Sequence, residues 1–190
     1  MRTDIVIRPE RKSDYKFIIP LVLRAFAEGT DYSDGTDVLA FVEEIRESEF
    51  YLPELSFVAL LGETVVGHFL FSILPLSKTP QGGHGGAEQN DIVMMAPVAV
   101  HPDYFRQGVG TVMLTQGIAE VKKRDYKGII VEGNDHFYHR FGFRTSSEFG
   151  IYPTSGWPAE SPQFMMCQET RPRSLAGIGG YVVYDMYETA

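Results

Sequence analysis

Apolar residues along the chain alternate between short continuous runs and helical spacing. Residues 92–100 are almost entirely apolar but far too few to span a membrane, so they predict a strand covered on both faces. A glycine-bearing turn follows, and then Leu114, Ile118 and Val121 recur at helical spacing. Residues 127–131 form the next buried run. The centre of the chain is therefore predicted to be strand, turn, helix and strand.

The flanking segments extend this alternating order. Pro9 ends a first apolar run, and Gly62 with Glu63 joins two β-rich runs into a predicted hairpin. The first helix is expected to bury an apolar face that includes Phe17 and Ile18. The elements expected outside the centre are strands at 5–9, 56–61, 64–74, 164–167 and 181–187, and helices that end at 26 and span 36–48.

Pro97 interrupts the apolar run at 92–100. Proline cannot donate to a β-ladder, so an internal strand tolerates it only where the pairing is already broken. The strand is therefore expected to separate from a neighbouring strand at this point.

Composition narrows the class of protein. A chain of 190 residues with 44% hydrophobic content is most simply one domain spanning 1–190, and a net charge of −8 argues against nucleic-acid binding. The single Cys167 fits a reducing compartment, and no signal peptide or membrane span is visible, so a cytoplasmic protein is expected. His84 has no second clustered ligand beside it, so no metal site is predicted.

The turn before the central helix has the features of an anion site. Gly108 and Gly110 let a ligand approach the backbone, Arg106 adds positive charge, and the first helical turn carries no carboxylate. A simple tight turn would explain the two glycines equally well. A dinucleotide fingerprint would need a third glycine where Met113 stands, and a P-loop would need a Gly-Lys-Ser/Thr sequence that is absent, so both are disfavoured.

Three motifs in this region carry a family resemblance. The sequences VAVHPDY at 98–104, QGVG at 107–110 and YHRFGF at 138–143 resemble those of the GCN5-related N-acetyltransferase (GNAT) superfamily, and in particular its YhbS-type predicted N-acetyltransferases. The resemblance implies an α/β fold built on a mixed sheet of six to seven strands. Helices would flank this sheet, and the fourth and fifth strands would be splayed apart. It also implies acetyl-CoA as the co-substrate.

The resemblance assigns roles to individual residues. Tyr138 aligns with the tyrosine that protonates the departing CoA thiolate, and Glu132 is one candidate for the general base, with Asp91, His101 or a water relay as alternatives. The pantetheine arm is expected to pair with the strand at 98–100. The residues expected to contact the cofactor are Val98, Ala99, Val100, Phe105, Arg106, Gln107, Gly108, Val109, Gly110, Thr111, Asn134 and Tyr138.

Two departures from the family pattern bear on these roles. Phe105 stands where the family usually carries Arg or Gln, which affects a side-chain contact to the pyrophosphate. Met94 stands where histone-type members carry a strand glutamate, which leaves the general base open.

The expected function is an acetyl-CoA-dependent N-acetyltransferase that transfers acetyl directly to a primary amine of an unidentified small-molecule or peptide acceptor. Tyr32 and Asp34, in the loop between the first two helices, are candidates for acceptor contact, and Trp157 lies in a loop expected to wall a pocket. The alternative is an acyl-CoA-binding module that senses or scaffolds without turnover. No nucleic-acid or membrane partner is expected, and a homodimer is an open alternative.

Overall fold

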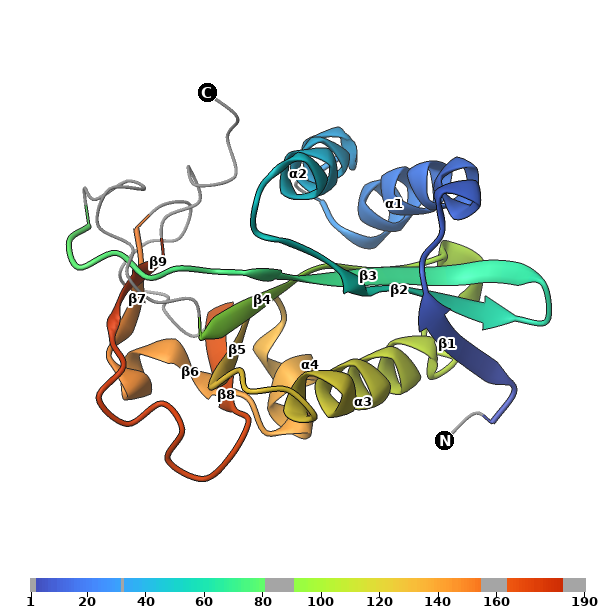
Figure 1. Cartoon of the computed structure of the whole chain (residues 1–190). Coiled ribbons are helices and arrows are strands. Elements are labelled where there is room, and N and C mark those ends of the chain that lie inside the picture. Colours follow the sequence, from blue (N-terminus) through green and yellow to red (C-terminus); the bar gives the residue numbers. More distant parts are fainter. Residues whose placement is uncertain (1–2, 32, 81–90, 155–163, 183–190) are drawn as a thin grey trace. The chain divides into compact units, whose positions relative to one another are not determined.

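The computed structural model describes residues 3–31, 33–80, 91–154 and 164–182, and the fold is built from the strands and helices within them (Figure 1). Tyr32, His84, Trp157 and the end of the expected 181–187 strand lie outside the described residues. The strands are β1 (Ile5–Pro9), β2 (Tyr51–Leu61), β3 (Thr64–Ile73), β4 (Ile92–Val100), β5 (Gly128–Glu132), β6 (Arg144–Thr145), β7 (Ile151–Pro153), β8 (Met165–Glu169) and β9 (Gly180–Val182). The α-helices are α1 (Tyr15–Gly29), α2 (Thr36–Glu47), α3 (Val109–Lys122) and α4 (Asp135–Tyr138).

Within the described residues, one mixed sheet contains seven strands in the order β1-β2-β3-β4-β5-β8-β6. The β4–β5 pair is parallel, whereas β1–β2, β5–β8 and β6–β8 are antiparallel. The predicted mixed-sheet α/β class is confirmed. The chain divides into two compact units, Met1–Phe71 with Ala96–Glu120 and Ser72–Met95 with Val121–Ala190, and each is described in turn.

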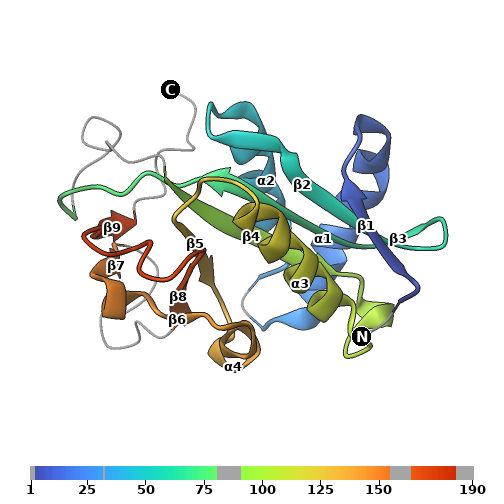
Figure 2. The ribbon, with the colours of Figure 1, turned by 60° about the horizontal axis from the view of Figure 1, so that its bottom comes forward.

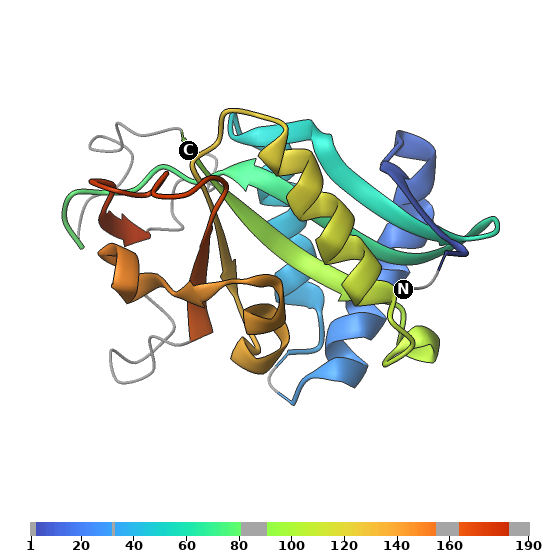
Figure 3. The same ribbon diagram turned by 90° about the horizontal axis from the view of Figure 1, so that it is seen from below.

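In the first unit, α1 and α2 cover one face of β2 and β3, and α3 covers the other, as the view from below shows (Figure 3). Side chains alternate between the faces of a strand, and β3 shows this clearly. Gly67 and Phe69 face α3, where a Cβ added at Gly67 would lie 2.5 Å from the sulfur of Met113. His68, between them, faces the α1–α2 side, where it meets Glu10.

The inner face of α1 is narrower than expected. Phe17 is 50% exposed, so its predicted burial is wrong. One residue turns a helix by about 100°, so Phe17 falls beside a face that is centred on its neighbour Ile18. The buried cluster on this side of the sheet consists of Ile18, Leu21, Val22, Ala25, Val58 and Ala99.

A buried ionic cluster fixes β1, α2, β2 and β3 together. Glu10, just after β1, accepts hydrogen bonds from Arg46 of α2 at 3.0 Å, Tyr51 of β2 at 2.9 Å and His68 of β3 at 2.8 Å. The side chains of Glu10, Arg46 and His68 are 3%, 5% and 0% exposed. Buried charges are tolerated when they are paired and hydrogen-bonded, as here. The carboxylate of Glu43, half exposed, also accepts from Arg46 at 2.7 Å.

In the second unit, β5 is paired along its full length with β8, and β8 in turn pairs with β6 (Figure 2). The seventh strand of the sheet is therefore β6, whose two residues are too few to give a periodic signal in the sequence. The C-terminal strand was expected from residue 181, and β9 lies there, but it pairs with β7 in a separate two-stranded sheet.

The contact between α3 and β3 is tight enough to test. A Cβ added at Gly117 would lie 2.5 Å from Cε2 of Phe69, so we expect Gly117→Ala to lower the free energy of unfolding by about 1–3 kcal/mol through overpacking. This loss should occur although alanine favours a helix over glycine by about 1 kcal/mol. Urea denaturation measures it, with the exposed neighbour Gln116→Ala as the control. A Gly117→Ala protein as stable as the wild type would contradict tight packing here.

The ionic cluster predicts loss of stability in acid. Burial lowers the pKa of His68, which favours its neutral form, and this contribution is lost as pH falls below about 6.5, the pKa in the unfolded chain. Burial opposes ionisation of Glu10, but the hydrogen bond from His68 and the charge of Arg46 hold its pKa below the usual value, so its contribution is lost at still lower pH.

We therefore expect the free energy of unfolding to fall between about pH 7 and pH 5, and to fall less steeply in His68→Gln. Glutamine keeps an N–H donor for Glu10 but does not titrate. Urea denaturation across this pH range gives both slopes, and their difference reports the contribution of His68. Parallel slopes for the two proteins would show that His68 does not bind a proton on unfolding.

Candidate functional site

Within the described residues, β4 continues beyond its ladder with β5. The ladder between β4 and β5 runs from Ile92↔Gly128 to Met94↔Ile130, although β4 continues to Val100. The expected splay between the fourth and fifth strands is therefore found. Pro97, which follows a cis peptide bond, has no N–H to offer the ladder.

Burial alternates along the same segment of β4. Ala99 is 1% exposed and belongs to the cluster beneath α1, whereas Val98 and Val100 are only partly buried. Of the three strand residues expected to contact the cofactor, Ala99 therefore directs its side chain into the core. Its side chain is therefore not available to a ligand.

The loop between β4 and α3 is fixed by its own hydrogen bonds. The N–H of Phe105 donates to Pro102 at 3.0 Å, and the Gln107 side chain donates to the carbonyl of Asp103 at 2.8 Å. Arg106 is exposed and adopts φ 59°, a left-handed conformation that costs a non-glycine residue energy and recurs at ligand sites. Gly108 follows with φ 85°, which glycine adopts at little cost.

The amino end of α3 presents backbone donors. Its first bond within the helix runs from the N–H of Val112 to the carbonyl of Gly108 at 3.2 Å, so the N–H groups of Val109, Gly110 and Thr111 have no partner within the helix. No acidic side chain lies in the first turn. Partial positive charge and open donors at one helix end suit a phosphate. The four residues from Gly108 to Thr111 are called the cradle below.

Phe105 has a packing role that the sequence did not predict. A Cβ added at Gly29 of α1 would lie 3.3 Å from Cζ of Phe105, so the phenyl ring rests on the end of α1. With its N–H also used within the loop, Phe105 has neither a polar side chain nor a free donor for a cofactor.

A second group of candidate residues lies in the second unit, around the carboxyl end of β5. Tyr138 is 8% exposed, and its ring packs edge-on against Phe137 and Phe143 at centroid distances of 5.3 and 5.8 Å. A Cβ added at Gly133 would lie 3.1 Å from Cε2 of this ring, so the ring covers the backbone that directly follows Glu132. Tyr138, Glu132 and Asn134 are thus brought together.

Asn134 and Gly133 hold Tyr138 in place. The side chain of Asn134 accepts from the N–H of Phe137 at 3.0 Å and caps α4, which carries Tyr138 at its end. Gly133 has φ +143°, outside the range that other residues readily adopt. Its role was not predicted, and its only sequence signal is a glycine directly after a buried strand.

The other two residues considered as general base are Asp91 and His101. Asp91 lies far from Tyr138, and both ring nitrogens of His101 already have neighbouring polar groups. Asp91 lies at the amino end of β4, paired with Lys127 at 2.6 Å, and five residues of β5 place it about 16 Å from the end that meets Tyr138. His101 accepts from the N–H of Asp103 at 3.3 Å, and its other nitrogen lies 3.1 Å from a guanidinium nitrogen of Arg24. Glu132 is the candidate whose neighbour in the chain, Gly133, lies against the ring of Tyr138.

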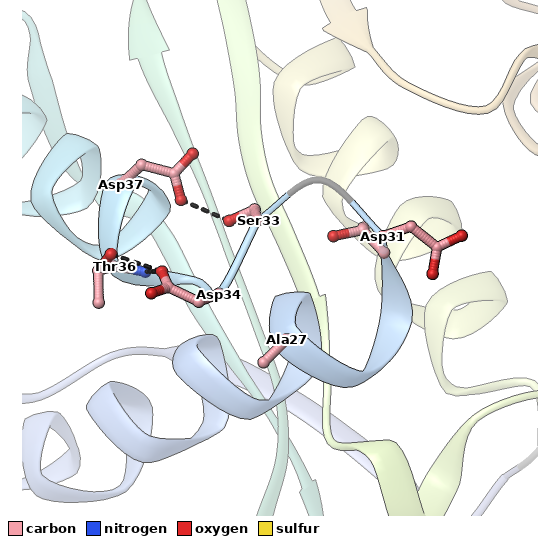
Figure 4. A pocket seen from close by; sticks show the side chains of 7 residues that line it. Ala27, Asp31, Ser33, Asp34, Thr36 and Asp37 are labelled. Carbon is pink, nitrogen blue, oxygen red and sulfur yellow. Dashed lines mark hydrogen bonds between the residues drawn. The ribbon is translucent and has the colours of Figure 1, made fainter.

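An acidic pocket of about 570 Å³ lies between the end of α1 and the start of α2 (Figure 4). Asp34 accepts from the N–H of Thr36 at 3.0 Å and from its hydroxyl at 2.5 Å, and these bonds lower the pKa of Asp34. Ser33 donates to Asp37. Asp34 was expected to contact the acceptor, whereas Asp31 and Asp37 were not predicted as site residues. The signal that could have indicated them is the run of three aspartates within seven residues. The pocket is lined by Ala27, Thr30, Asp31, Ser33, Asp34, Thr36 and Asp37.

Two findings for the described residues bear on other classes of site. No group of three or more His, Cys, Asp or Glu side chains in that part of the chain is arranged to hold a metal ion. No helix found there is both long and apolar enough to cross a membrane.

Two curated proteins are similar in sequence to most of this chain. YjhQ of Escherichia coli K12, described as an uncharacterised N-acetyltransferase, is 28% identical over 169 residues, which cover 87% of this chain and 86% of YjhQ. YhbS of the same strain, described in the same way, is 28% identical over 181 residues, which cover 95% of this chain and 96% of YhbS.

Two solved structures share the fold of this chain over most of its length. The crystal structure of E. coli YhbS in complex with CoA matches with a TM-score of 0.78 at 26% identity, over 98% of this chain and 93% of that one. A GNAT acetyltransferase of Brucella melitensis in complex with acetyl-CoA shares the fold, with a TM-score of 0.66 at 24% identity over 88% and 89% of the two chains.

The model of the Acetyltransferase (GNAT) family matches residues 23–143, a range that includes the free end of β4, the cradle and Tyr138. This chain therefore belongs to the GNAT family of acetyltransferases.

Proposed function

We propose that the protein binds acetyl-CoA and transfers its acetyl group directly to a primary amine in a ternary complex. The observation that carries this proposal is the amino end of α3, where successive N–H groups are open beside Gly108 and no carboxylate is present. That end suits the pyrophosphate of CoA. The likeness to the CoA complex of YhbS over nearly the whole chain supports the choice of ligand.

The pantetheine arm would bind along β4. Backbone groups of Val98 and Val100 lie beyond the last β4–β5 pair, so an amide-bearing chain can pair with them as a substitute strand. Ala99 offers no side chain to the arm, since that side chain is buried. The arm would lead the thioester away from the cradle and along the strand.

Tyr138 would act as general acid. A phenol has an ordinary pKa of about 10, so it is protonated at neutral pH and can donate to a thiolate as the tetrahedral intermediate collapses. The capped helix and the aromatic neighbours restrict the ring to one position, as a proton donor requires.

Glu132 is our candidate for the general base, directly or through a water molecule. It ends β5 and is paired through its backbone with Met165, so its position in the chain is fixed. It precedes Gly133, whose backbone touches the Tyr138 ring. A carboxylate there would accept the proton that the amine loses on attack.

The acceptor amine would enter by the acidic pocket. Asp31, Asp34 and Asp37 are among the residues that line it, and a protonated amine is attracted by negative charge of this kind before it is deprotonated for attack. The hydrogen bonds from Thr36 lower the pKa of Asp34, which favours its ionised form. We therefore place the acceptor among cationic amines, small or peptidic.

A second candidate is an acyl-CoA-binding module without turnover. Met94, 3% exposed, occupies the strand position where histone-type relatives carry a catalytic glutamate, which favours this alternative. A panel of amines incubated with acetyl-CoA, with release of free CoA thiol as the signal, separates the two. Binding of acetyl-CoA with no thiol release for any amine would support the non-catalytic role.

We expect Gly110→Leu to abolish CoA binding while the fold is retained. The leucine side chain would occupy the approach to the open N–H groups at the start of α3. Calorimetry with CoA measures the loss, and Thr115→Leu, exposed on the same helix, serves as the matched control. The wild type should bind CoA and give no signal with NAD, because the third glycine of a dinucleotide turn is replaced by Met113. Tight NAD binding without CoA binding would overturn the proposal.

We expect Tyr138→Phe to lower turnover by roughly 10²–10⁴, the range typical of general acid catalysis. The change removes one hydroxyl from a ring that aromatic neighbours already hold, so acetyl-CoA affinity and melting temperature should stay near wild type. Steady-state kinetics and thermal melts provide the data, with Tyr152→Phe, which is 43% exposed, as the control. Unchanged turnover would show that another group protonates the sulfur, and a large fall in melting temperature would mark Tyr138 as structural.

A further inference from the structure

Tyr138 lies where two very short helical segments meet. α4 ends at Tyr138, and a single 3₁₀ turn, His139–Phe141, follows it directly. The backbone hydrogen bonds here are local. The N–H of Tyr138 donates to the carbonyl of Asn134 at 3.2 Å, and the N–H of Gly142 donates to that of His139 at 3.0 Å. Helices of one turn are unstable by themselves, because nucleation costs more free energy than so few bonds supply. The position of Tyr138 therefore depends on restraints from outside the segment.

The ring of Tyr138 contacts two neighbours that belong to different segments. One is the backbone of Gly133 after β5, where an added Cβ would lie 3.1 Å from the ring. The other is the ring of Phe143, 5.8 Å away between centroids. Because the Tyr138 ring touches both, its position depends on where Phe143 is held relative to β5. A general acid must lie within about 2.6–3.2 Å of the atom that it protonates, and a displacement of about 1 Å can cost about 10²-fold in rate.

Gln168 of β8 links these two neighbours. Its backbone is opposite Ile129 in the β5–β8 ladder, so its place relative to β5 is fixed. Its side chain donates from Nε2 to the carbonyl of Phe141, the last residue of the 3₁₀ turn. A Cβ added at Gly142 would lie 3.1 Å from the same nitrogen. The amide of Gln168 thus ties the chain directly before Phe143 to the strand beside β5.

The ladder between β6 and β8 cannot replace this link. It consists of two pairs and begins with Arg144 opposite Cys167, after the turn has been made. Gly142 has φ 86°, which glycine adopts at little cost, so the chain changes direction between the 3₁₀ turn and the ladder. The ladder holds the residues that follow Phe143, whereas Gln168 holds the carbonyl that precedes Gly142.

The amide of Gln168 is poorly suited to a purely stabilising role. The side chain is 8% exposed, and in the part of the chain that the structure describes no group donates to its Oε1. A buried acceptor without a partner costs free energy, which offsets part of what the Nε2 bond contributes. The net contribution to stability is therefore small. The bond is nevertheless directional, so it still fixes where the carbonyl of Phe141 lies.

We propose that Gln168 is a positioning residue for Tyr138, because it holds the turn that leads to Phe143 against β8 and so fixes where the Tyr138 hydroxyl lies. Its importance for catalysis rests on the proposed function, in which Tyr138 is the general acid. The restraint on the segment 134–143 is a property of the fold and does not depend on that function.

The experiment compares Gln168→Met with Thr170→Val. Thr170 directly follows β8 and is also 8% exposed, and its hydroxyl donates to the carbonyl of Tyr126 at 2.5 Å. Tyr126 precedes β5, at the end of that strand away from Gly133. Both substitutions remove a side-chain hydrogen bond to a backbone carbonyl. Gln168→Met also removes the unpaired oxygen, so we expect it to lower the melting temperature less than Thr170→Val does.

The effect on turnover should have the opposite order. We expect Gln168→Met to lower kcat by about tenfold or more with both KM values little changed, because a misplaced proton donor affects the transition state rather than binding. Thr170→Val should keep wild-type turnover. In a Tyr138→Phe background, Gln168→Met should lower turnover no further, since the hydroxyl that it positions is absent. A further tenfold loss in that background, or an equal loss in Thr170→Val, would overturn the positioning role.

Hydrogen exchange supplies a readout that does not require activity. In Gln168→Met, the amide hydrogens of Tyr138 and Gly142 should exchange faster by about tenfold or more, whereas Thr170→Val should leave them near wild type. If Gln168→Met does not fold, Gln168→Leu also lacks the donor and should give the same pattern.

Equal exchange at these two amides in the wild type and both variants would show that Gln168 does not hold the segment. The same conclusion follows, without any variant, if both amides exchange as fast in the wild type as in an unfolded chain. If wild-type protein acetylates no amine, the proposed function fails, and the exchange data still decide whether Gln168 holds the segment that carries Tyr138.

Discussion

A carboxylate removed from water stays ionised only where positive charge and hydrogen-bond donors compensate for the lost water, and in this protein Glu10 meets this condition by joining four elements of the first unit. A guanidinium, a phenol and an imidazole converge on its two oxygens. None of these donors could be left in the core alone without a large energetic penalty. The helix α2, the edge of the sheet and its second and third strands are therefore interdependent.

Glycine is used where two parts must approach closely. Gly35 allows two helices to meet backbone to backbone, Gly117 allows α3 to lie on the rings of Phe69 and Phe71, and Gly133 allows the ring of Tyr138 to cover the end of β5. Each of these contacts positions a part of the candidate site without polar interactions. The chemistry of the site thus depends on the absence of side chains at these positions as much as on the side chains present.

The sequence predicted those features that a local pattern can encode. The apolar run of β4, the spacing of α3 and the YHRFGF motif around Tyr138 each lie in one short segment, and the structure agrees with all three. The family resemblance supplied the splayed strands, and the ladder that stops at Met94 agrees with it. Features that depend on distant pairing were missed, such as β6 as the seventh strand and β9 in a second sheet.

The same limit applies to the site residues. The ionic cluster brings together positions 10, 46, 51 and 68, and no spacing rule links a glutamate after a short strand to an arginine near the end of a helix. Phe105 was expected to contact the cofactor in place of the usual Arg or Gln, and only its contact with Gly29 reveals what the ring does. His101 looked like a possible base, and only the neighbouring Arg24 shows that its ring nitrogens are occupied.

The hydrogen bonds of the acidic pocket have a consequence for how this family can diversify. Asp34 bonds to Thr36, and Ser33 bonds to Asp37, so these side chains take their partners from within five consecutive residues and none from the core. A mutation here exchanges one exposed local turn for another and leaves the buried carboxylate and its partners untouched. Under the proposed function, Ser33, Asp34 and Asp37 can therefore be exchanged to suit another amine at little cost to folding.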